Sequence, residues 1–391
     1  MKAVTWQAAR KVATETVPDP SIVEPTDVII RVTSTGICGS DLHLLDTFVP
    51  FMNRGDIIGH EPMGVVEDVG GDVRNLRAGD RVVIPFVIAC GECAMCRLGL
   101  TTQCETTQNR ESGLGASLYG YTKLYGGIAG GQAEFLRVPL ADFNARKVGD
   151  ELDDERYLFL GDILPTAWQG VEYANVPEGG TLGVLGLGPV GQLATRIGGY
   201  RGYRVFAADP VPERRALAER HGVQTFDLTD DLLDRLREST DGRGPDGVID
   251  AVGMEAHGNP VAAFAQNAVA ILPDPMGEKL AKKAGVDRLA ALLLAFDAVR
   301  RGGTVSITGV YAGAADPLPM MILFDKGLSL RTGECNVHRW LDDLVPLVED
   351  PADPLGVTDL VTHRGGLDDA ADLYEAFKTE SDGCVKVVLR P

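Results

Sequence analysis

The 391-residue sequence has no apolar run that approaches the roughly 20 residues of a membrane-spanning helix. The residues after Met1 include no apolar segment typical of a secretory signal, so we expect a cytoplasmic protein without membrane contact. Positive charge is scarce: 37 Lys and Arg residues accompany 56 Asp and Glu residues, and the net charge is −19. Such an acidic surface repels phosphate backbones and anionic lipids, so we expect no nucleic-acid partner.

Apolar residues make up 45% of the chain, which is enough for a large core, and the length fits two domains. Residues 1 to about 155 are rich in glycine and β-branched residues, with strand-like stretches at 28–32 and 64–69. From about 164 to 312, predicted strands and helices alternate. The strands are expected at 181–185, 204–208, 247–251 and 304–309, the helices at 189–200 and 213–221. This order predicts an α/β fold with a parallel sheet of βαβ units, and a last strand follows at 385–389.

Four of the seven cysteines lie close together in sequence, as Cys90, Cys93, Cys96 and Cys104. Four thiolates on one short loop can surround a zinc ion at about 2.3 Å and leave no position for water or substrate, which makes such a site structural. Two disulfides or four unrelated thiols are the alternatives. Disulfides need an oxidising compartment, for which the sequence gives no sign. We therefore predict a structural zinc site.

A glycine-rich turn, Gly186-Leu-Gly188-Pro-Val-Gly191, follows a predicted strand and precedes a predicted helix. The glycines allow a tight turn, a close approach of the backbone to a pyrophosphate, and close packing of helix on strand. Asp209 ends the next strand, where it can bind ribose hydroxyls and repel a 2′-phosphate, which favours NAD over NADP. Arg214 lies nearby and weakens this preference. The alternative is a glycine-rich turn without a ligand.

Candidate ligands for a second metal lie upstream. Residues 38–43 bring a thiol, a hydroxyl, a carboxylate and an imidazole into one turn, and His60 follows a strand-like run. A catalytic zinc site uses three protein ligands and keeps a fourth position open. Cys38, His60 and Asp162 are the candidate ligands. A lone Cys or His is more often a core residue than a ligand, and the residues alone leave both interpretations open.

Taken together, these motifs resemble zinc-dependent medium-chain alcohol dehydrogenases over essentially the whole chain. The resemblance is carried by residues 36–41 and 59–61, the four-cysteine loop, the glycine-rich turn and the terminal strand. It implies a GroES-like β-rich catalytic domain at 1–163 and 313–391, and a Rossmann NAD-binding domain at 164–312. The chain is most similar to glutathione-independent formaldehyde dehydrogenases, which also carry an aspartate at the position of Asp162. The long stretch between residues 253 and 302 resembles an insertion that covers the cofactor in those relatives.

The resemblance also implies a role for each ligand. Cys38, His60 and Asp162 would bind the catalytic zinc, so two zinc ions per chain are expected. Glu61 would lie next to the metal. Asp41 would accept the second ring N–H of His60 and fix its tautomer.

The same resemblance implies the path of the reaction. Hydride would pass from an alcohol, or from the hydrate of an aldehyde, to a nicotinamide packed against Val190 and Thr166. The proton would leave through Ser40 and the cofactor ribose to His43. Loops at 48–52, 119–125 and 257–290 would line the substrate pocket.

Other functions stay open at this stage. They include an aldehyde dismutase that retains its NAD, a polyol or amino-alcohol dehydrogenase, a non-catalytic zinc-stapled binding protein, and a zinc-free reductase of the same fold. We expect a homo-oligomer, a tetramer rather than a dimer. Cys335 and Cys384 are expected to be buried, and Lys386 to lie at the surface.

Overall fold

The computed structural model describes residues 1–253, 289–311, 318–379 and 383–391, and the chain divides into two compact units. Unit 1 contains Met1–Thr166 and Glu334–Pro391, and unit 2 contains Ala167–Gly333. The second break falls later than the predicted boundary at 312/313, because one more strand joins the sheet of unit 2. Most of the stretch resembling an insertion, residues 254–288, lies outside the described residues. No helix in the described ranges is both long and apolar enough to cross a membrane.

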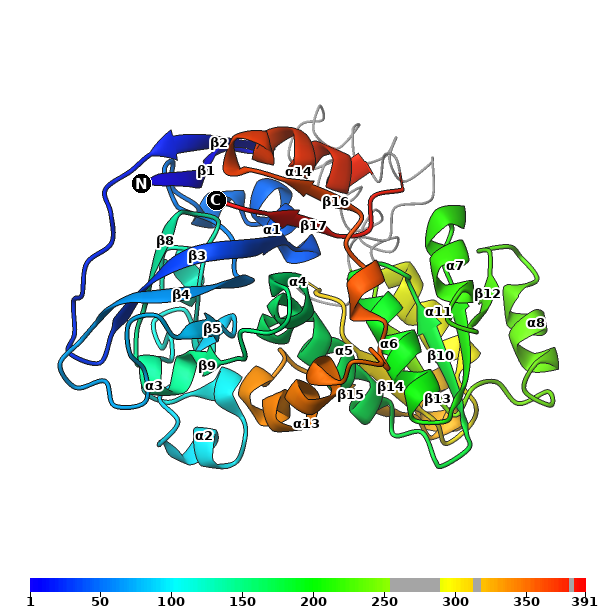
Figure 1. The fold of residues 1–391 in the computed structure, drawn as a ribbon. Helices are drawn as coiled ribbons and strands as arrows, with labels where there is room; N and C mark the ends of the chain where they lie inside the picture. Colours follow the sequence, from blue (N-terminus) through cyan, green and yellow to red (C-terminus); the bar gives the residue numbers. More distant parts are fainter. Residues whose placement is uncertain (254–288, 312–317, 380–382) are drawn as a thin grey trace, which may run out of the picture. The chain divides into compact units, whose positions relative to one another are not determined.

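Unit 1 is built on a mainly antiparallel sheet with the order β16-β17-β3-β4-β5-β9, and β8 also pairs with β3 (Figure 1). The central strand β3, Val28–Ile37, is rich in β-branched residues and nearly all of it is buried. The other strands of this sheet are β4 (Pro62–Val69), β5 (Arg81–Val83), β8 (Phe135–Val138), β9 (Arg146–Lys147), β16 (His363–Gly365) and β17 (Val387–Leu389). The predicted strands near 28–32, 64–69 and 385–389 are therefore present.

Smaller elements surround this sheet. The hairpin of β1 (Lys2–Ala8) and β2 (Lys11–Thr16) shares a buried core with α1 (Gly39–Asp46) and α14 (Ala370–Thr379). The remaining strands and helices of unit 1 are β6 (Val87–Ile88), β7 (Ser117–Leu118), α2 (Ala94–Arg97), α3 (Ala141–Asn144), α4 (Asp154–Tyr157) and α13 (Val337–Glu349). Helix α5, Ile163–Ala174, contains the first break between the units.

Unit 2 contains the predicted parallel sheet, with the order β12-β11-β10-β13-β14-β15 (Figure 1). The strands are β10 (Thr181–Leu185), β11 (Arg204–Ala208), β12 (Gln224–Phe226), β13 (Gly247–Asp250), β14 (Thr304–Ile307) and β15 (Ser329–Thr332). The described helices of unit 2 after α5 are α6 (Pro189–Tyr200), α7 (Pro212–Glu219), α8 (Leu232–Glu238), α11 (Ala290–Ala298) and α12 (Met320–Lys326).

The order of the strands places the cofactor turn. From β10 the chain moves outward to β11 and β12, and then returns to place β13 on the other side of β10. Right-handed crossovers put the helices before and after this reversal on opposite faces of the sheet. Parallel sheets bind ligands at such a reversal, beyond the carboxyl ends of the strands. The turn that starts at Gly186 follows β10 directly and lies at that point.

Candidate active site and zinc centres

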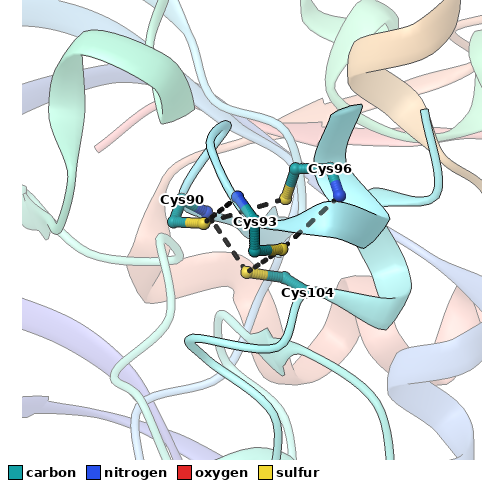
Figure 2. A group of neighbouring side chains, drawn as sticks. All are labelled: Cys90, Cys93, Cys96 and Cys104. Atoms are coloured by element: carbon teal, nitrogen blue, oxygen red, sulfur yellow. Dashed lines mark hydrogen bonds between the residues drawn. The ribbon is translucent and has the colours of Figure 1, made fainter. Parts of the chain in front are cut away.

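The four cysteines of the 90–104 loop lie together, with all four sulfur atoms within 4.8 Å of one another (Figure 2). The Sγ atoms of Cys90 and Cys96 are 4.0 Å apart, and so are those of Cys93 and Cys104. Zn–S bonds of about 2.3 Å put the corners of a tetrahedral site roughly 3.8 Å apart. Small inward shifts would therefore close the loop around a zinc ion.

Hydrogen bonds in this loop favour thiolates. The backbone N–H groups of Glu92 and Cys93 donate to Cys90 Sγ at 3.4 and 3.3 Å. Burial raises the pKa of Cys90, but a hydrogen bond from Thr106 and these two amides outweigh it and lower the pKa to about 6. Burial raises the pKa of Cys96, which therefore needs a cation to ionise. The thiolate is the form that binds zinc, so the loop fits the metal chemically as well as geometrically.

A second group of side chains gathers Cys38, His60, Glu61 and Asp162, whose ligand atoms also lie within 4.8 Å of one another. Cys38 follows β3, His60 and Glu61 precede β4, and Asp162 precedes α5. Asp162 Oδ2 lies 3.2 Å from His60 Nε2 and 3.5 Å from Cys38 Sγ. The three predicted ligands thus meet at one point, although 124 positions separate Cys38 from Asp162.

The second group is buried and rich in groups that can carry negative charge. His60, Glu61 and Asp162 are all at most 7% exposed. Burial, together with the carboxyls of Asp162 and Glu61, raises the pKa of Cys38 to about 11. A divalent cation would reverse this shift, because positive charge favours the thiolate. A thiol, an imidazole and a carboxylate form a donor set suited to a catalytic zinc with one open position.

Further residues contact the candidate ligands. Asp41 Oδ1 lies 3.1 Å from His60 Nδ1, and Ser40 Oγ lies 3.1 Å from His60 Nε2. Thr166 Oγ1 donates to Asp162 Oδ1 at 3.0 Å. A carboxylate on the second ring nitrogen orients an imidazole and raises its basicity, which suits His60 as a ligand. The predicted contact of Thr166 with the nicotinamide stays a prediction.

Aromatic rings surround His60. The ring of Tyr121 lies 6.4 Å from it and that of Phe86 6.3 Å, both edge-on. Phe48 contacts Tyr121 at 5.9 Å, and the ring of His43 packs edge-on against Phe48 at 6.5 Å. Phe48 and Tyr121 come from two of the loops predicted to line the substrate pocket. In the third loop, residues 257–288 lie outside the described part of the chain. The proton path from Ser40 to His43 stays a prediction.

The glycine-rich turn of unit 2 has the geometry of a phosphate cradle. Gly186 has φ +87°, in the left-handed region that favours glycine, and a Cβ at Gly191 would meet the Gly186 carbonyl oxygen at 1.9 Å. A Cβ at Gly188 would meet nothing within 4 Å, so that side of the turn is open. Val190 lies in the first turn of α6, whose N–H groups can bind an anion.

Asp209 connects the end of β11 to this turn. Its side chain accepts hydrogen bonds from the backbone N–H groups of Leu187 at 2.6 Å and Val211 at 2.8 Å. Arg214 Nη1 lies 4.0 Å from the Asp209 carboxylate. These contacts hold a carboxylate next to the open side of the turn, with a guanidinium beside it.

Comparisons with known proteins agree with this architecture. Two family models match: the alcohol dehydrogenase GroES-like domain over residues 24–146 and the zinc-binding dehydrogenase over residues 189–270. An uncharacterised zinc-type alcohol dehydrogenase-like protein of Bacillus subtilis is 40% identical over 397 residues, which cover 100% of both chains. The chain belongs to the zinc-dependent medium-chain alcohol dehydrogenases.

Two further relatives extend the comparison. A glutathione-independent formaldehyde dehydrogenase of Pseudomonas aeruginosa is 36% identical over 96% of this chain and 94% of its own length. The solved structure of alcohol dehydrogenase TADH from Thermus sp. ATN1 matches with a TM-score of 0.81 and 34% identity, over 100% of this chain and 99% of that one. The predicted family, fold class and enzyme class are confirmed. This medium-chain alcohol dehydrogenase is an oxidoreductase that uses zinc and a nicotinamide cofactor and acts on small molecules.

The prediction that Lys386 lies at the surface of this dehydrogenase is wrong. Its side chain is fully buried, its Nζ pairs with Glu61 at 2.6 Å, and it donates to the Ile37 carbonyl oxygen at 3.0 Å. A buried ammonium group needs an ionic partner. That partner lies 325 positions away, so no local sequence pattern could reveal it. Cys335 and Cys384 are buried, as predicted.

Sequence reasoning also missed two uncharged residues of the dehydrogenase. Gln132 donates a hydrogen bond to the Asp41 carboxylate, and Tyr374 donates one to Gln132. Neither belongs to a motif, and neither residue type is a usual metal ligand. Only the fold brings them to the zinc site.

Proposed function

We propose that the protein oxidises a small alcohol, or the hydrate of a small aldehyde, with NAD as the acceptor. The observation that carries this proposal is the meeting of Cys38, His60 and Asp162 at one buried point. When bound, zinc there would polarise the substrate oxygen, and NAD would accept the hydride. A cytoplasmic location is proposed with it, because the free thiols of both zinc clusters need a reducing compartment.

The contacts of Asp41 and Glu61 support their proposed roles. Asp41 holds the Nδ1 side of His60, so that Nε2 faces the metal position. Glu61 stays beside the ligands, where the Lys386 cation balances its charge. As in the predicted relay, Ser40 would take the proton that the substrate hydroxyl loses, and the cofactor ribose would pass it to His43.

The aromatic rings around His60 support small substrates. Phe48, Phe86 and Tyr121 occupy space beside this ligand and present apolar ring edges and faces. Short carbon chains fit such surroundings better than polyols, which would leave several hydroxyls without hydrogen-bond partners.

The contacts of Asp209 support NAD over NADP. Two backbone amides hold its carboxylate beside the turn, where a negative charge would repel a 2′-phosphate. Arg214 reduces this repulsion but does not replace the carboxylate.

Exposed apolar residues support a homo-oligomer, for which we retain the tetramer as the proposed state. On α12, Met321 is 79% exposed and Phe324 85%. Among the described strands, the neighbouring β15 is the last in its sheet, and all its residues are exposed. An apolar surface beside an open strand edge is a usual place for association of two copies. The Phe324→Asp variant should lower the mass measured by light scattering, and an unchanged mass would contradict this interface.

Elemental analysis and a substrate panel test the proposed activity together. We expect two zinc ions per chain and NADH formation with at least one small alcohol or aldehyde. One zinc ion per chain without turnover would instead indicate a non-catalytic zinc-stapled protein. NAD that survives extensive dialysis, with no net NADH formed from an aldehyde, would indicate dismutation.

A further inference from the structure

We propose that Gln132 and Tyr374 are positioning residues of the catalytic zinc site, and that they act on His60 through Asp41. The inference rests on the proposed function, because it takes His60 as a zinc ligand. It assigns a role to two buried polar residues that no motif contains.

The contacts form one continuous chain. Tyr374 Oη donates to Gln132 Oε1 at 2.9 Å, and Gln132 Nε2 donates to Asp41 Oδ2 at 3.2 Å. Asp41 Oδ1 in turn lies 3.1 Å from His60 Nδ1. Three side chains thus lead from α14 to the ligand.

The donors and acceptors in this series of hydrogen bonds have a fixed order. Gln132 Nε2 also donates to the Gly36 carbonyl oxygen at 3.1 Å. Both groups near Nε2 are pure acceptors, so the NH₂ end of the amide must face them and the oxygen must face Tyr374. Tyr374 can satisfy that oxygen only as a donor. Without its hydroxyl, the amide would lose the contact that holds it in this orientation.

Burial makes the loss of any of these hydrogen bonds costly. Asp41 and Gln132 are 0% exposed and Tyr374 is 3% exposed. In such surroundings water does not readily replace a lost donor, and an unpaired polar atom is costly. Asp41 Oδ2 accepts from Gln132 and from the backbone N–H of Cys38 at 3.0 Å. These two donors hold the carboxylate in place and oppose its rotation away from His60.

Packing holds Gln132 in place as well. Gly59, directly before His60, has φ +95°, and a Cβ there would lie 2.3 Å from Gln132 Cγ. The Gln132 side chain therefore fills the space next to the His60 backbone. A change at Gln132 would act on both the backbone and the imidazole of this ligand.

Zinc binding by the full-length protein tests the proposal. We would load the wild type, Tyr374→Phe, Gln132→Leu and the double variant with zinc, and compete it off with a chelator. The zinc of the four-cysteine loop serves as an internal reference. Affinity of the catalytic site should fall roughly tenfold in Gln132→Leu, as for other outer contacts of metal ligands, and by less in Tyr374→Phe. With Co²⁺ in place of zinc, the visible absorption of the catalytic site should shift in both.

The double variant tests whether Tyr374 acts on Asp41 through Gln132. If Tyr374 acts only through Gln132, adding Tyr374→Phe to Gln132→Leu should change zinc affinity no further. Tyr157→Phe is the matched control, since this buried tyrosine donates to Glu349 at 3.2 Å and contacts no ligand. It should lower the melting temperature without changing zinc affinity or the Co²⁺ spectrum.

Three results would overturn the proposal: a Tyr374→Phe protein with wild-type zinc affinity and spectrum, effects no larger than those of Tyr157→Phe, or losses that multiply in the double variant. Tyr374→Phe removes only one oxygen atom and is a small change to the core. If Gln132→Leu does not fold, the result for Tyr374→Phe alone tests the proposal. A wild type that holds one zinc ion would refute the proposed function itself. A wild type with two zinc ions and unchanged variants would refute only the positioning role.

Discussion

Asp162 supplies the third predicted ligand of the candidate catalytic site. It approaches Cys38 and His60 from a turn far along the chain, and Thr166 holds its second carboxylate oxygen. Without Asp162 only two of the three predicted ligands remain, a thiol and an imidazole, which are too few for a stable zinc site with an open position.

The Asp162→Ala variant should therefore contain one zinc ion instead of two and lose turnover. Elemental analysis and NADH absorbance measure both effects. Asp150→Ala, which removes an exposed carboxylate, should retain both ions. A variant at position 162 that keeps two zinc ions would show that another residue, such as Glu61, is the third ligand.

Asp209 gives a second prediction at the residue scale. In Asp209→Gly the ratio of kcat/KM for NAD to kcat/KM for NADP should fall by roughly tenfold or more, about 1.4 kcal/mol, because the charge that repels a 2′-phosphate is gone. Asp227→Ala removes a neighbouring carboxylate that pairs with Arg215, and it should leave the ratio unchanged. An unaltered ratio in Asp209→Gly would mean that this residue does not distinguish the 2′-hydroxyl of NAD from the 2′-phosphate of NADP.

Residue type and spacing decide what the sequence could predict of the site. Cys90 to Cys104 form one short motif, and the glycine-rich turn is local too, so both are visible without a structure. Lys386 and Tyr374 are not, because each depends on a partner more than 240 positions away. Buried polar contacts across such separations exist only in the folded chain.

At the scale of elements, the four-cysteine loop is fastened to α13. Thr102 donates from its backbone N–H and its hydroxyl to Asn336 Oδ1, both at 3.1 Å. A separate contact comes from α3, where the ring of Phe143 stacks on His338 at 4.4 Å. The loop thus joins the late part of unit 1 to the early part, and its metal stabilises that connection.

Cys93→Ser should remove the zinc ion of this loop and keep the catalytic one. The free energy of unfolding should fall by at least about 3 kcal/mol, as for the loss of other structural metals. Thermal unfolding and zinc content give the two readouts. Cys384→Ala, a buried thiol outside the loop, should retain both ions, and equal stability losses in the two variants would argue against a structural zinc.

The elements were predictable to different degrees. The strands and helices from Thr181 to Ala208 have clear periodicity and appear where the sequence places them. β12 has only three residues and β15 is exposed throughout, so no apolar pattern marks either strand. This strand moves the domain break beyond the predicted boundary at 312/313.

At the scale of the whole molecule, Glu155 links distant parts of unit 1. It accepts two hydrogen bonds from Arg364, both at 2.7 Å, and one from Arg390 at 3.2 Å. The hydrogen bond from Arg364 is the main cause of a lowered pKa at Glu155. A carboxyl with a lowered pKa in the folded state stabilises the fold above its unfolded pKa, about 4.3, and this contribution is lost as the pH falls through the folded pKa.

Glu155→Gln should therefore lower the free energy of unfolding at neutral pH by an amount on the order of 1 kcal/mol, and the melting temperature with it. The difference from wild type should shrink as the pH falls below about 4. Glu67→Gln breaks an exposed pair with Arg31 and should have little effect at any pH. A difference that stays constant from neutral to acidic pH would contradict the role of this ion pair.

The division of unit 1 between the two ends of the chain sets the order in which the protein can mature. During synthesis, residues 1–166 emerge long before β17, which pairs with the end of β3 next to Cys38. Until then Ile37 lacks its neighbour and Glu61 lacks the Lys386 ammonium group. The surroundings of the candidate catalytic site are thus completed only after Lys386 and β17 have been synthesised. A chain without β17 and the residue before it would keep the four cysteines and the three predicted catalytic ligands, but Glu61 would have no ammonium group to balance its charge.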